Sequence, residues 1–304
     1  MTDLNALDLP SLFEKLVRSD HLESILRIAV EEDLGELGDV TTAALERADE
    51  PVVASVVSRT DGVLSGRPVI DVLLLRFSSG LKWNWFCEDG AKIQKGDVIC
   101  EISGTFSDLL PIERLILNML GRLSGVASLT ARFVAEVAGC HVLLCDTRKT
   151  TPGLRTLEKY AVRCGGGYLH RIGLFDAFLL KDNHVGSIAP GEYEASVREA
   201  IRAARNQSEL RFVEVEVDSL DQLDAILAMP EGTVDIVLLD NMEPARLKEA
   251  VARRNEQSPR VLLEASGGIT LKTIAAVAAT GVDRIAVGAL THSSVQLDFG
   301  LDLK

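Results

Sequence analysis

The chain has 304 residues, of which 47% are hydrophobic and 25% are charged, and its formal net charge is −13. This composition is that of a globular protein long enough for two domains, and the excess of acid argues against nucleic acid as a partner. Charges interrupt every apolar run and the start lacks a basic-then-apolar pattern, so neither a membrane span nor a signal peptide is expected. The five cysteines form no CxxC pair, which favours a reducing cytoplasm over a disulfide framework or a zinc site.

The first third of the chain predicts a mixed antiparallel domain with helices. A valine-rich stretch from 52 to 58, followed by the turn residues Asp61-Gly62, predicts a β-hairpin. Residues 109–120 have the mostly apolar pattern of a buried helix, and a second helix is expected after Gly125. The first of these helices also carries Arg114, and an arginine on such a helix either extends into solvent or faces an anion.

From residue 141 onward, apolar runs alternate with helical patterns. The runs cover residues 142–145, 177–180, 212–217, 234–239, 261–265 and 284–287. Near-continuous apolar strands separated by helices predict a parallel sheet covered by helices, in a closed or nearly closed barrel. The alternating tail from 295 to 303 predicts a strand that returns to the first domain.

The segment from 146 to 184 is basic, with seven Lys/Arg against four acids. Positive charge concentrated in an acidic protein predicts a polyanionic ligand. Five cationic residues abut predicted strand ends or glycines, where α/β barrels keep their ligands: Arg148, Lys149, His170, Arg171 and Lys181. Glu158-Lys159, by contrast, is expected on a solvated helix face.

Acids and small-residue loops follow the later strands. Glu214 and Glu216 share one face of their strand, where carboxylates are costly unless paired or metal-bound. Two acids on different strands, Glu216 and Asp240 after the next strand, suggest a Mg²⁺ site. The loops 264–269 and 288–293 match the phosphate cradle of a barrel, although a purely structural histidine is an equal alternative for His292. No nucleophile triad or dinucleotide fingerprint is present, so this set suits catalysis through positioning and charge stabilisation.

A series of motifs then resembles one family, quinolinate phosphoribosyltransferase, also called nicotinate-nucleotide pyrophosphorylase (carboxylating). The motifs, in chain order, are EEDLGELGDVTT, LSGVA, TRKTTPGLRTLEKYAVRCGGG, HRIGL, LLKDNH, VEVEVDSL, LLDNM, EASGGI and VGALTHS. The resemblance implies an α/β fold with an N-terminal α/β open-sandwich domain in residues 1–120. It places an incomplete (β/α) barrel in residues 121–290 and a C-terminal strand, in residues 291–304, that returns to the N-terminal domain.

The resemblance also implies an activity. The enzyme would be a pentosyltransferase of de novo NAD biosynthesis that joins quinolinate to 5-phosphoribosyl-1-pyrophosphate with Mg²⁺ as cofactor. The products would be nicotinate mononucleotide, pyrophosphate and CO₂. The assembly would be a cytoplasmic homodimer in which each subunit completes its neighbour's site, with no nucleic-acid or membrane partner.

Residue roles follow from the same resemblance. The quinolinate carboxylates would be held by Arg148, Lys149, His170, Arg171 and, from the partner subunit, Arg114. Lys181 would meet the phosphoribosyl substrate, while Glu216 and Asp240 would face its ribose and the Mg²⁺. The 5′-phosphate cradle would comprise Ser266, Gly267, Gly268, Gly288 and Ala289. Thr147 and His292 complete the expected substrate contacts. The expected catalytic residues are Lys149, Lys181, Glu216 and Asp240.

Two alternatives stay open at this point. A related branch, associated with molybdate transport, is similar in fold, but there the segments corresponding to 149–152 (KTTP) and 181–184 (KDNH) usually differ. The second alternative is a non-catalytic barrel that binds a phosphorylated metabolite. Glu216 and Asp240 argue against it, because binding a phosphate alone needs no acids at strand ends.

Overall fold

The computed structural model describes residues 2–78, 80–185 and 192–304. The chain divides into two compact units that interleave along the sequence. The barrel unit comprises Arg132–Lys149 and Gly167–Ala289 with the start of the chain, and the sheet unit comprises Leu4–Ala131, Thr150–Gly166 and Leu290–Lys304. The predicted domain ranges 1–120, 121–290 and 291–304 stay a prediction. Each compact unit is made of several separate segments of the chain, so the units are not continuous ranges of this kind.

The sheet unit is built on a four-stranded antiparallel sheet in the order β12-β1-β5-β3. Its strands are β1 (Pro51–Ser58), β3 (Lys82–Trp85), β5 (Val98–Thr105) and β12 (Phe299–Leu303). β12 pairs with β1, which is the return that the alternating tail predicts. The predicted hairpin is wrong, because β5 and β12 occupy both edges of β1. The next strand, β2 (Gly62–Val63), pairs instead with β4 (Lys92–Ile93).

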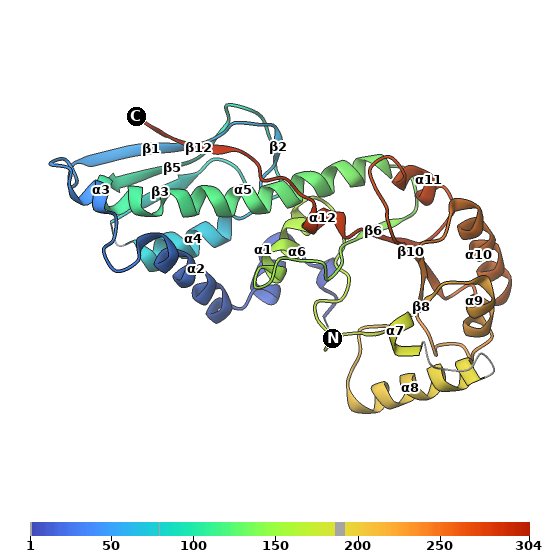
Figure 1. Ribbon diagram of the computed structural model, residues 1–304. Helices are drawn as coiled ribbons and strands as arrows, with labels where there is room; N and C mark the ends of the chain where they lie inside the picture. Colours follow the sequence, from blue (N-terminus) through green and yellow to red (C-terminus); the bar gives the residue numbers. More distant parts are fainter. Residues whose placement is uncertain (1, 79, 186–191) are drawn as a thin grey trace. The chain divides into compact units, whose positions relative to one another are not determined.

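A single long helix, α5 (Phe106–Glu136), replaces the two helices expected from the sequence. Figure 1 shows it running along the sheet of β1, β3 and β5. Gly125 lies within it because the chain crosses there: a Cβ at this position would lie 2.1 Å from the carbonyl oxygen of Val295. The glycine thus permits a close approach of two segments rather than a break in the helix. The remaining helices of this unit are η1 (Leu4–Ala6), α1 (Leu9–Leu16), α2 (Ser19–Leu34), α3 (Val40–Ala43), α4 (Arg67–Phe77) and α6 (Arg155–Cys164).

The barrel unit contains six parallel strands in the order β6-β11-β10-β9-β8-β7. They are β6 (Leu143–Cys145), β7 (Phe178–Leu180), β8 (Val213–Val217), β9 (Ile236–Asp240), β10 (Leu262–Ser266) and β11 (Arg284–Ala286). The first strand therefore pairs with the last, and the predicted barrel-like arrangement is confirmed. β6 does not pair with β7, although Tyr168, in the segment between them, forms a parallel bridge with Cys145. The barrel is incomplete on that side.

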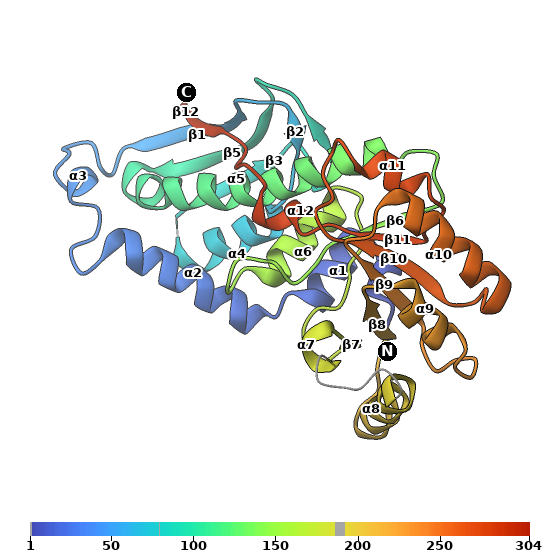
Figure 2. The ribbon, with the colours of Figure 1, turned by 45° about the vertical axis from the view of Figure 1, so that its right-hand side comes forward.

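Helices cover the outer side of this sheet, as Figure 2 shows for α9, α10 and α11. The helices that follow the strands are α7 (Asp182–Val185), α8 (Tyr193–Gln207), α9 (Leu220–Leu227), α10 (Pro244–Gln257), α11 (Ile274–Ala278) and α12 (Ala289–His292). The strands are buried on both faces, since all five residues of β8 and the first four of β9 are inaccessible to solvent. This double burial explains their continuous apolar sequences. Among the described residues, no helix has the length and hydrophobicity needed to cross a membrane.

Candidate active site

Most of the predicted site residues lie at the carboxyl ends of the parallel strands. Thr147, Arg148 and Lys149 follow β6, Lys181 follows β7, Glu216 lies in β8, Asp240 and Ser266 end β9 and β10, and Gly288 follows β11. Because the six strands are parallel, these ends form one rim of the barrel, the usual place for a ligand site. His170 and Arg171 reach the same end, since they follow Tyr168, which runs parallel to β6.

Two predicted residues belong to the sheet unit instead. The Arg114 side chain is 64% exposed on α5, where its nearest acid is Glu113 at 3.9 Å. His292 ends α12, also exposed, and its Nδ1 lies 2.8 Å from Ser293 Oγ. Their roles, like those of the residues on the rim, stay predictions.

Two arginines on the rim act on one another. Arg171 is buried and Arg148 is half-buried. Burial and the positive charge of Arg148 both lower the pKa of Arg171, while the carboxylates of Glu214 and Asp176 oppose this shift. Two cations held in partial burial repel one another until a ligand of opposite charge arrives. The pair is therefore suited to bind an anion with more than one negative group.

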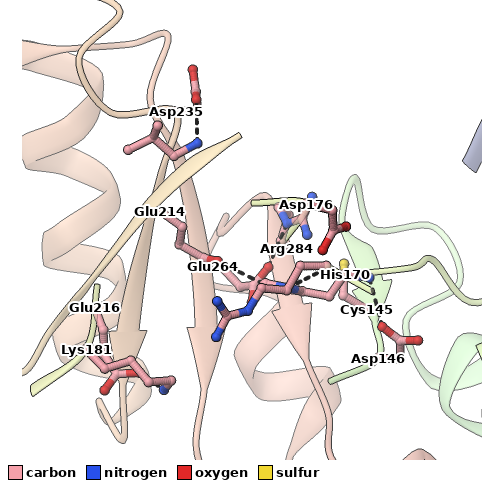
Figure 3. A network of polar contacts seen from close by, with 12 residues as sticks. Cys145, Asp146, His170, Asp176, Lys181, Glu214, Glu216, Asp235, Glu264 and Arg284 are labelled. Carbon is pink, nitrogen blue, oxygen red and sulfur yellow. Dashed lines mark hydrogen bonds and ion pairs between the residues drawn. The ribbon is translucent and has the colours of Figure 1, made fainter. Parts of the chain in front are cut away.

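A buried ionic network, which the sequence did not reveal as a unit, lies inside the barrel (Figure 3). It consists of His170, Glu214, Glu264 and Arg284, and is called the quartet below. His170 Nε2 lies 2.9 Å from Glu214 Oε2 and 3.2 Å from Glu264 Oε1. Arg284 Nε donates to Glu264 Oε2 at 2.6 Å. Both glutamates are inaccessible to solvent, and Phe212 lies edge-on to the His170 ring at 5.3 Å.

Charges within the quartet compensate one another. Burial disfavours the imidazolium form of His170 and the carboxylates of Glu264 and Glu214 favour it, so these two effects on its pKa oppose one another. Because Nδ1 accepts the N–H of Arg171, the ring is neutral and carries its proton on Nε2. Burial would raise the pKa of Glu264, yet His170 and Arg284 lower it to about 2. Burial and the charge of Glu264 raise the pKa of Glu214, which favours a proton on that carboxyl group.

The same three residues, His170, Glu214 and Glu264, form the only group in the described parts of the chain whose ligand atoms lie close enough together for a metal ion. Arg284 already balances the charge of Glu264, and burial raises the pKa of Glu214 toward its neutral form. A cation is not required there, and the predicted Mg²⁺ residues Glu216 and Asp240 lie outside this group.

Glu264→Gln is expected to lower the free energy of unfolding by about 3 kcal/mol near pH 6, because it removes one partner of a buried ion pair. The folded-state pKa of Glu264, about 2, is below its ordinary value of 4.5, so its charge stabilises the fold fully above pH 4.5 and not below pH 2.

Thermal unfolding of the wild type and Glu264→Gln across this range measures the effect. The difference in melting temperature should be full above pH 4.5 and should shrink as the pH falls toward 2. A difference that is constant with pH would contradict an ionic origin.

The opposite part of the rim carries a second charged pair. The Lys181 ammonium contacts the Glu216 carboxylate, and the Lys181 side chain is 41% exposed whereas that of Glu216 is only 6% exposed. Asp240 Oδ2 accepts a hydrogen bond from Asn241 Nδ2 at 2.6 Å. A lysine that is open to solvent beside a buried carboxylate is free to reach a ligand on the rim.

The loop after β10 approaches the loop after β9 closely. Gly267 has a φ of +99°, and a Cβ there would lie 2.1 Å from Asn241 Oδ1. Asn241 itself has a φ of +52°, and its N–H donates to the Ser266 carbonyl at 2.9 Å. Gly268 also has a positive φ, of +57°, so two successive residues of this loop take a conformation that glycine adopts most readily.

In the sheet unit, one prediction is wrong. Glu158 and Lys159 do not lie on a solvated helix face, since both are inaccessible to solvent. Glu158 pairs with Arg122 of α5, whose Nε donates to Glu158 Oε1 at 3.0 Å. Arg122 also donates to the Thr291 carbonyl at 2.6 Å and to Ser294 Oγ at 2.8 Å. A charged residue in a polar helix sequence gives no sign of burial by itself, because its partner is distant in the chain.

Comparison with known proteins agrees with this arrangement. The family model described as quinolinate phosphoribosyl transferase, N-terminal domain, matches residues 39–124, and the C-terminal domain model matches residues 126–302. The nicotinate-nucleotide pyrophosphorylase [carboxylating] of Mycobacterium leprae is 44% identical over 289 residues, covering 93% of this chain and 98% of that protein. The probable enzyme of the same name from Bacillus subtilis is 36% identical and covers 93% of each.

Solved structures lead to the same family. The nicotinate-nucleotide pyrophosphorylase of Francisella tularensis superposes with a TM-score of 0.85 at 33% identity, with both chains fully covered. That of Ehrlichia chaffeensis gives a TM-score of 0.83 at 36% identity over 93% of this chain and 98% of that one. With its rim of cations and strand-end acids and with both domain models matched, this chain belongs to the quinolinate phosphoribosyl transferase family.

Proposed function

We propose that the rim of the barrel unit binds quinolinate beside 5-phosphoribosyl-1-pyrophosphate, for the decarboxylating phosphoribosyl transfer of NAD biosynthesis that is the activity of this family. The products are nicotinate mononucleotide, pyrophosphate and CO₂. The observation that carries the proposal is that Arg148 and Arg171 lie at the carboxyl ends of the parallel strands, close enough for the charge of Arg148 to lower the pKa of Arg171. Two cations in partial burial match the two carboxylates of quinolinate, and Lys181, Glu216 and Asp240 on the same rim match a sugar pyrophosphate.

The cationic side of the rim orients quinolinate. Guanidinium groups bind carboxylates through two parallel hydrogen bonds, so Arg148 and Arg171 fix the plane of the pyridine as well as its position. Thr147 Oγ1 accepts the N–H of Lys149 at 3.0 Å, which shapes the loop that presents these cations. The ring nitrogen is then held toward the ribose carbon, and a fixed attack geometry lowers the barrier without any acid or base.

The acidic side of the rim faces the phosphoribosyl donor. As pyrophosphate departs, positive charge develops on the ribose, and the carboxylates of Glu216 and Asp240 stabilise it. Lys181 neutralises the negative charge that collects on the leaving phosphates. Because Mg²⁺ is bound in proteins by one or two carboxylates together with substrate phosphates, Glu216 and Asp240 are suitable residues to hold it. When bound, Mg²⁺ would add positive charge beside the pyrophosphate.

Bond changes on the pyridine follow. The nitrogen lone pair forms the bond to the ribose carbon while the carbon–oxygen bond to pyrophosphate breaks. The nitrogen is now positive, so the adjacent carboxylate leaves as CO₂ and its bonding electrons remain on the ring carbon beside that charge. This carbon then takes up a proton to give nicotinate mononucleotide. The role of the protein is to bind and orient the dianion.

We also propose a homodimer in the cytoplasm, with Arg114 completing the site of the partner subunit. The Arg114 side chain is largely exposed and so is available to another chain. All five cysteines are free thiols, as is usual for a protein of a reducing compartment.

Subunit complementation tests the shared site. Arg114→Ala and Lys181→Ala are each expected to be inactive, but an equimolar mixture should recover activity. Random exchange gives mixed dimers in which one of two sites is intact, or about a quarter of all sites. The measurement is the rate of nicotinate mononucleotide formation after mixing. No recovery, under conditions where labelled wild-type subunits do exchange, would mean that Arg114 serves its own chain.

Gly267→Ala is expected to raise the KM for 5-phosphoribosyl-1-pyrophosphate by about tenfold, because forcing a side chain into this backbone conformation against Asn241 costs roughly 1–3 kcal/mol and moves the loop. Gly232→Ala is the matched control, since Gly232 also has a positive φ, of +78°, lies before β9 and not on the rim, and a Cβ there meets nothing within 4 Å. Steady-state kinetics with the donor varied compares the two. Equal effects of both substitutions would contradict a role for the close approach to Asn241.

Turnover is the direct test of the proposed function. The protein is incubated with quinolinate, 5-phosphoribosyl-1-pyrophosphate and Mg²⁺, and nicotinate mononucleotide and CO₂ are measured. Nicotinate, which lacks the second carboxylate, serves as the control substrate and should react far more slowly. Binding of both substrates without product would favour the alternative of a non-catalytic binding barrel.

A further inference from the structure

The loop that carries Arg171 is held at both of its ends. At the far end, the buried carboxylate of Asp176 accepts the N–H groups of Ile172 and Gly173, each at 2.9 Å, and pairs with Arg211 at 3.1 Å. At the near end, the backbone N–H of His170 donates to Asp146 Oδ1 at 2.8 Å. Arg171 lies between these two anchors.

The ring of His170 connects Arg171 to the quartet. The backbone N–H of Arg171 donates to His170 Nδ1 at 2.7 Å. The other ring nitrogen, Nε2, faces the carboxylates of Glu214 and Glu264, and Glu264 is in turn held by Arg284. The contacts therefore run from β11 through Glu264 on β10 to the imidazole and on to the backbone of Arg171 (Figure 3).

We propose that Glu264, held by Arg284, is a positioning residue for quinolinate binding, which acts through the His170 ring on the backbone of Arg171. The proposal rests on the function proposed above for Arg171 as a ligand of the substrate carboxylate. It also assigns His170 a role different from the direct quinolinate contact that the resemblance implies. Both ring nitrogens are engaged within the protein, and the His170 side chain is only 6% exposed.

The location of the quartet supports a positioning role. Glu264 is inaccessible to solvent and so does not touch a ligand on the rim. A buried carboxylate that is held by both Arg284 and the His170 ring has few alternative positions, because moving it would leave a charge unpaired in a low-dielectric interior. A rigid carboxylate of this kind fixes the plane of the imidazole, and the imidazole fixes the peptide of Arg171.

Glu264→Gln is the first test, since glutamine keeps the shape of the side chain but removes its charge. It is expected to raise the quinolinate KM by about tenfold, as loss of a hydrogen bond to a charged group does, with kcat and the KM for 5-phosphoribosyl-1-pyrophosphate unchanged. The assay is run well below the melting temperature of each variant. Asp283→Asn is the control, because it weakens another Arg–carboxylate pair of the barrel unit, Arg254 Nη1 to Asp283 Oδ2 at 2.6 Å, in which Arg254 is buried and Asp283 is half-buried. It should lower the melting temperature without changing the quinolinate KM.

A double-mutant cycle gives the second test. His170→Asn retains an acceptor near the Nδ1 position but loses the connection to the glutamates. If the effect of Glu264 passes through the ring, His170→Asn and the double variant with Glu264→Gln should have the same quinolinate KM as Glu264→Gln alone. A raised KM in His170→Asn together with an unchanged KM in Glu264→Gln would overturn the proposal and favour direct contact of His170 with quinolinate. An increase of the quinolinate KM in Asp283→Asn equal to that in Glu264→Gln would also overturn the proposal.

Arg171→Ala separates failure of this inference from failure of the proposed function. If Arg171→Ala leaves the quinolinate KM unchanged, Arg171 is not a substrate ligand and the function proposed for it fails. If Arg171→Ala raises the KM but Glu264→Gln does not, the role of Arg171 stands and the positioning role of Glu264 is overturned.

Discussion

Replacement of Arg148 by alanine is expected to weaken quinolinate binding by about 10²–10³-fold, because truncating one partner of a desolvated charge pair costs roughly 2–5 kcal/mol. The positive charge of Arg148 lowers the pKa of Arg171, and a bound dianion would offset the repulsion between the two guanidinium groups. Without Arg148, one carboxylate of quinolinate would leave water with one fewer cation to bind it. Affinity for 5-phosphoribosyl-1-pyrophosphate should not change, because its groups face the other side of the rim.

Calorimetric titration of each substrate into the variant measures this effect. Arg246→Ala is the control: it removes an exposed cation from the outer helix α10 and so makes the same change in net charge away from the rim. Arg148→Lys is informative as well, since it keeps the charge but not the paired hydrogen bonds, and it should fall between wild type and alanine. Wild-type affinity for quinolinate in Arg148→Ala would remove the main support for the proposed function.

Lys181→Ala is expected to lower kcat by about 10²–10³-fold, the usual effect of removing one group that stabilises charge in the transition state. The ammonium contacts the carboxylate of Glu216, so its loss also leaves a nearly buried carboxylate without its cation. Charge on pyrophosphate grows as the bond to the ribose breaks, and a group that meets this charge acts on kcat more than on binding. The KM for quinolinate should therefore change little.

Single-turnover measurement of pyrophosphate release is the appropriate assay, because it reports the chemical step. Lys248→Ala, an exposed lysine of α10, is the charge-matched control and should be indistinguishable from wild type. A variant with normal pyrophosphate release but slow decarboxylation would contradict the role assigned here and would place Lys181 with the pyridine instead.

Local sequence patterns were sufficient to predict the parallel strands and to place residues on the rim of the barrel. Val213–Val217 and Ile236–Asp240 are continuous apolar strands because both faces are buried, and that requirement is visible in any short window of sequence. A residue just after such a strand must lie at its carboxyl end, so Lys181, Asp240 and Ser266 could be placed on one rim before the fold was known.

Contacts between distant residues could not be predicted in this way. The valine-rich β1 was expected to pair with its neighbour in sequence, but its partners are β5 and the C-terminal β12. Gly125 was expected to interrupt a helix, yet it allows the Val295 carbonyl to approach α5. The alternating tail did predict a strand that returns to the first domain, but the sequence around β1 and Gly125 does not identify the distant segments that contact them.

By itself, the sequence determined the strand periodicity, the cationic and acidic residues of the rim and, through ordered motifs, the family. Only the tertiary structure decided which charges are paired. Glu264 and Arg284 belong to neighbouring strands and His170 to a distant loop, and they become one network only when the barrel forms. The physical reason is that apolar periodicity follows from each residue's own burial, whereas the ionisation and position of a buried charge depend on the partners that the fold brings to it.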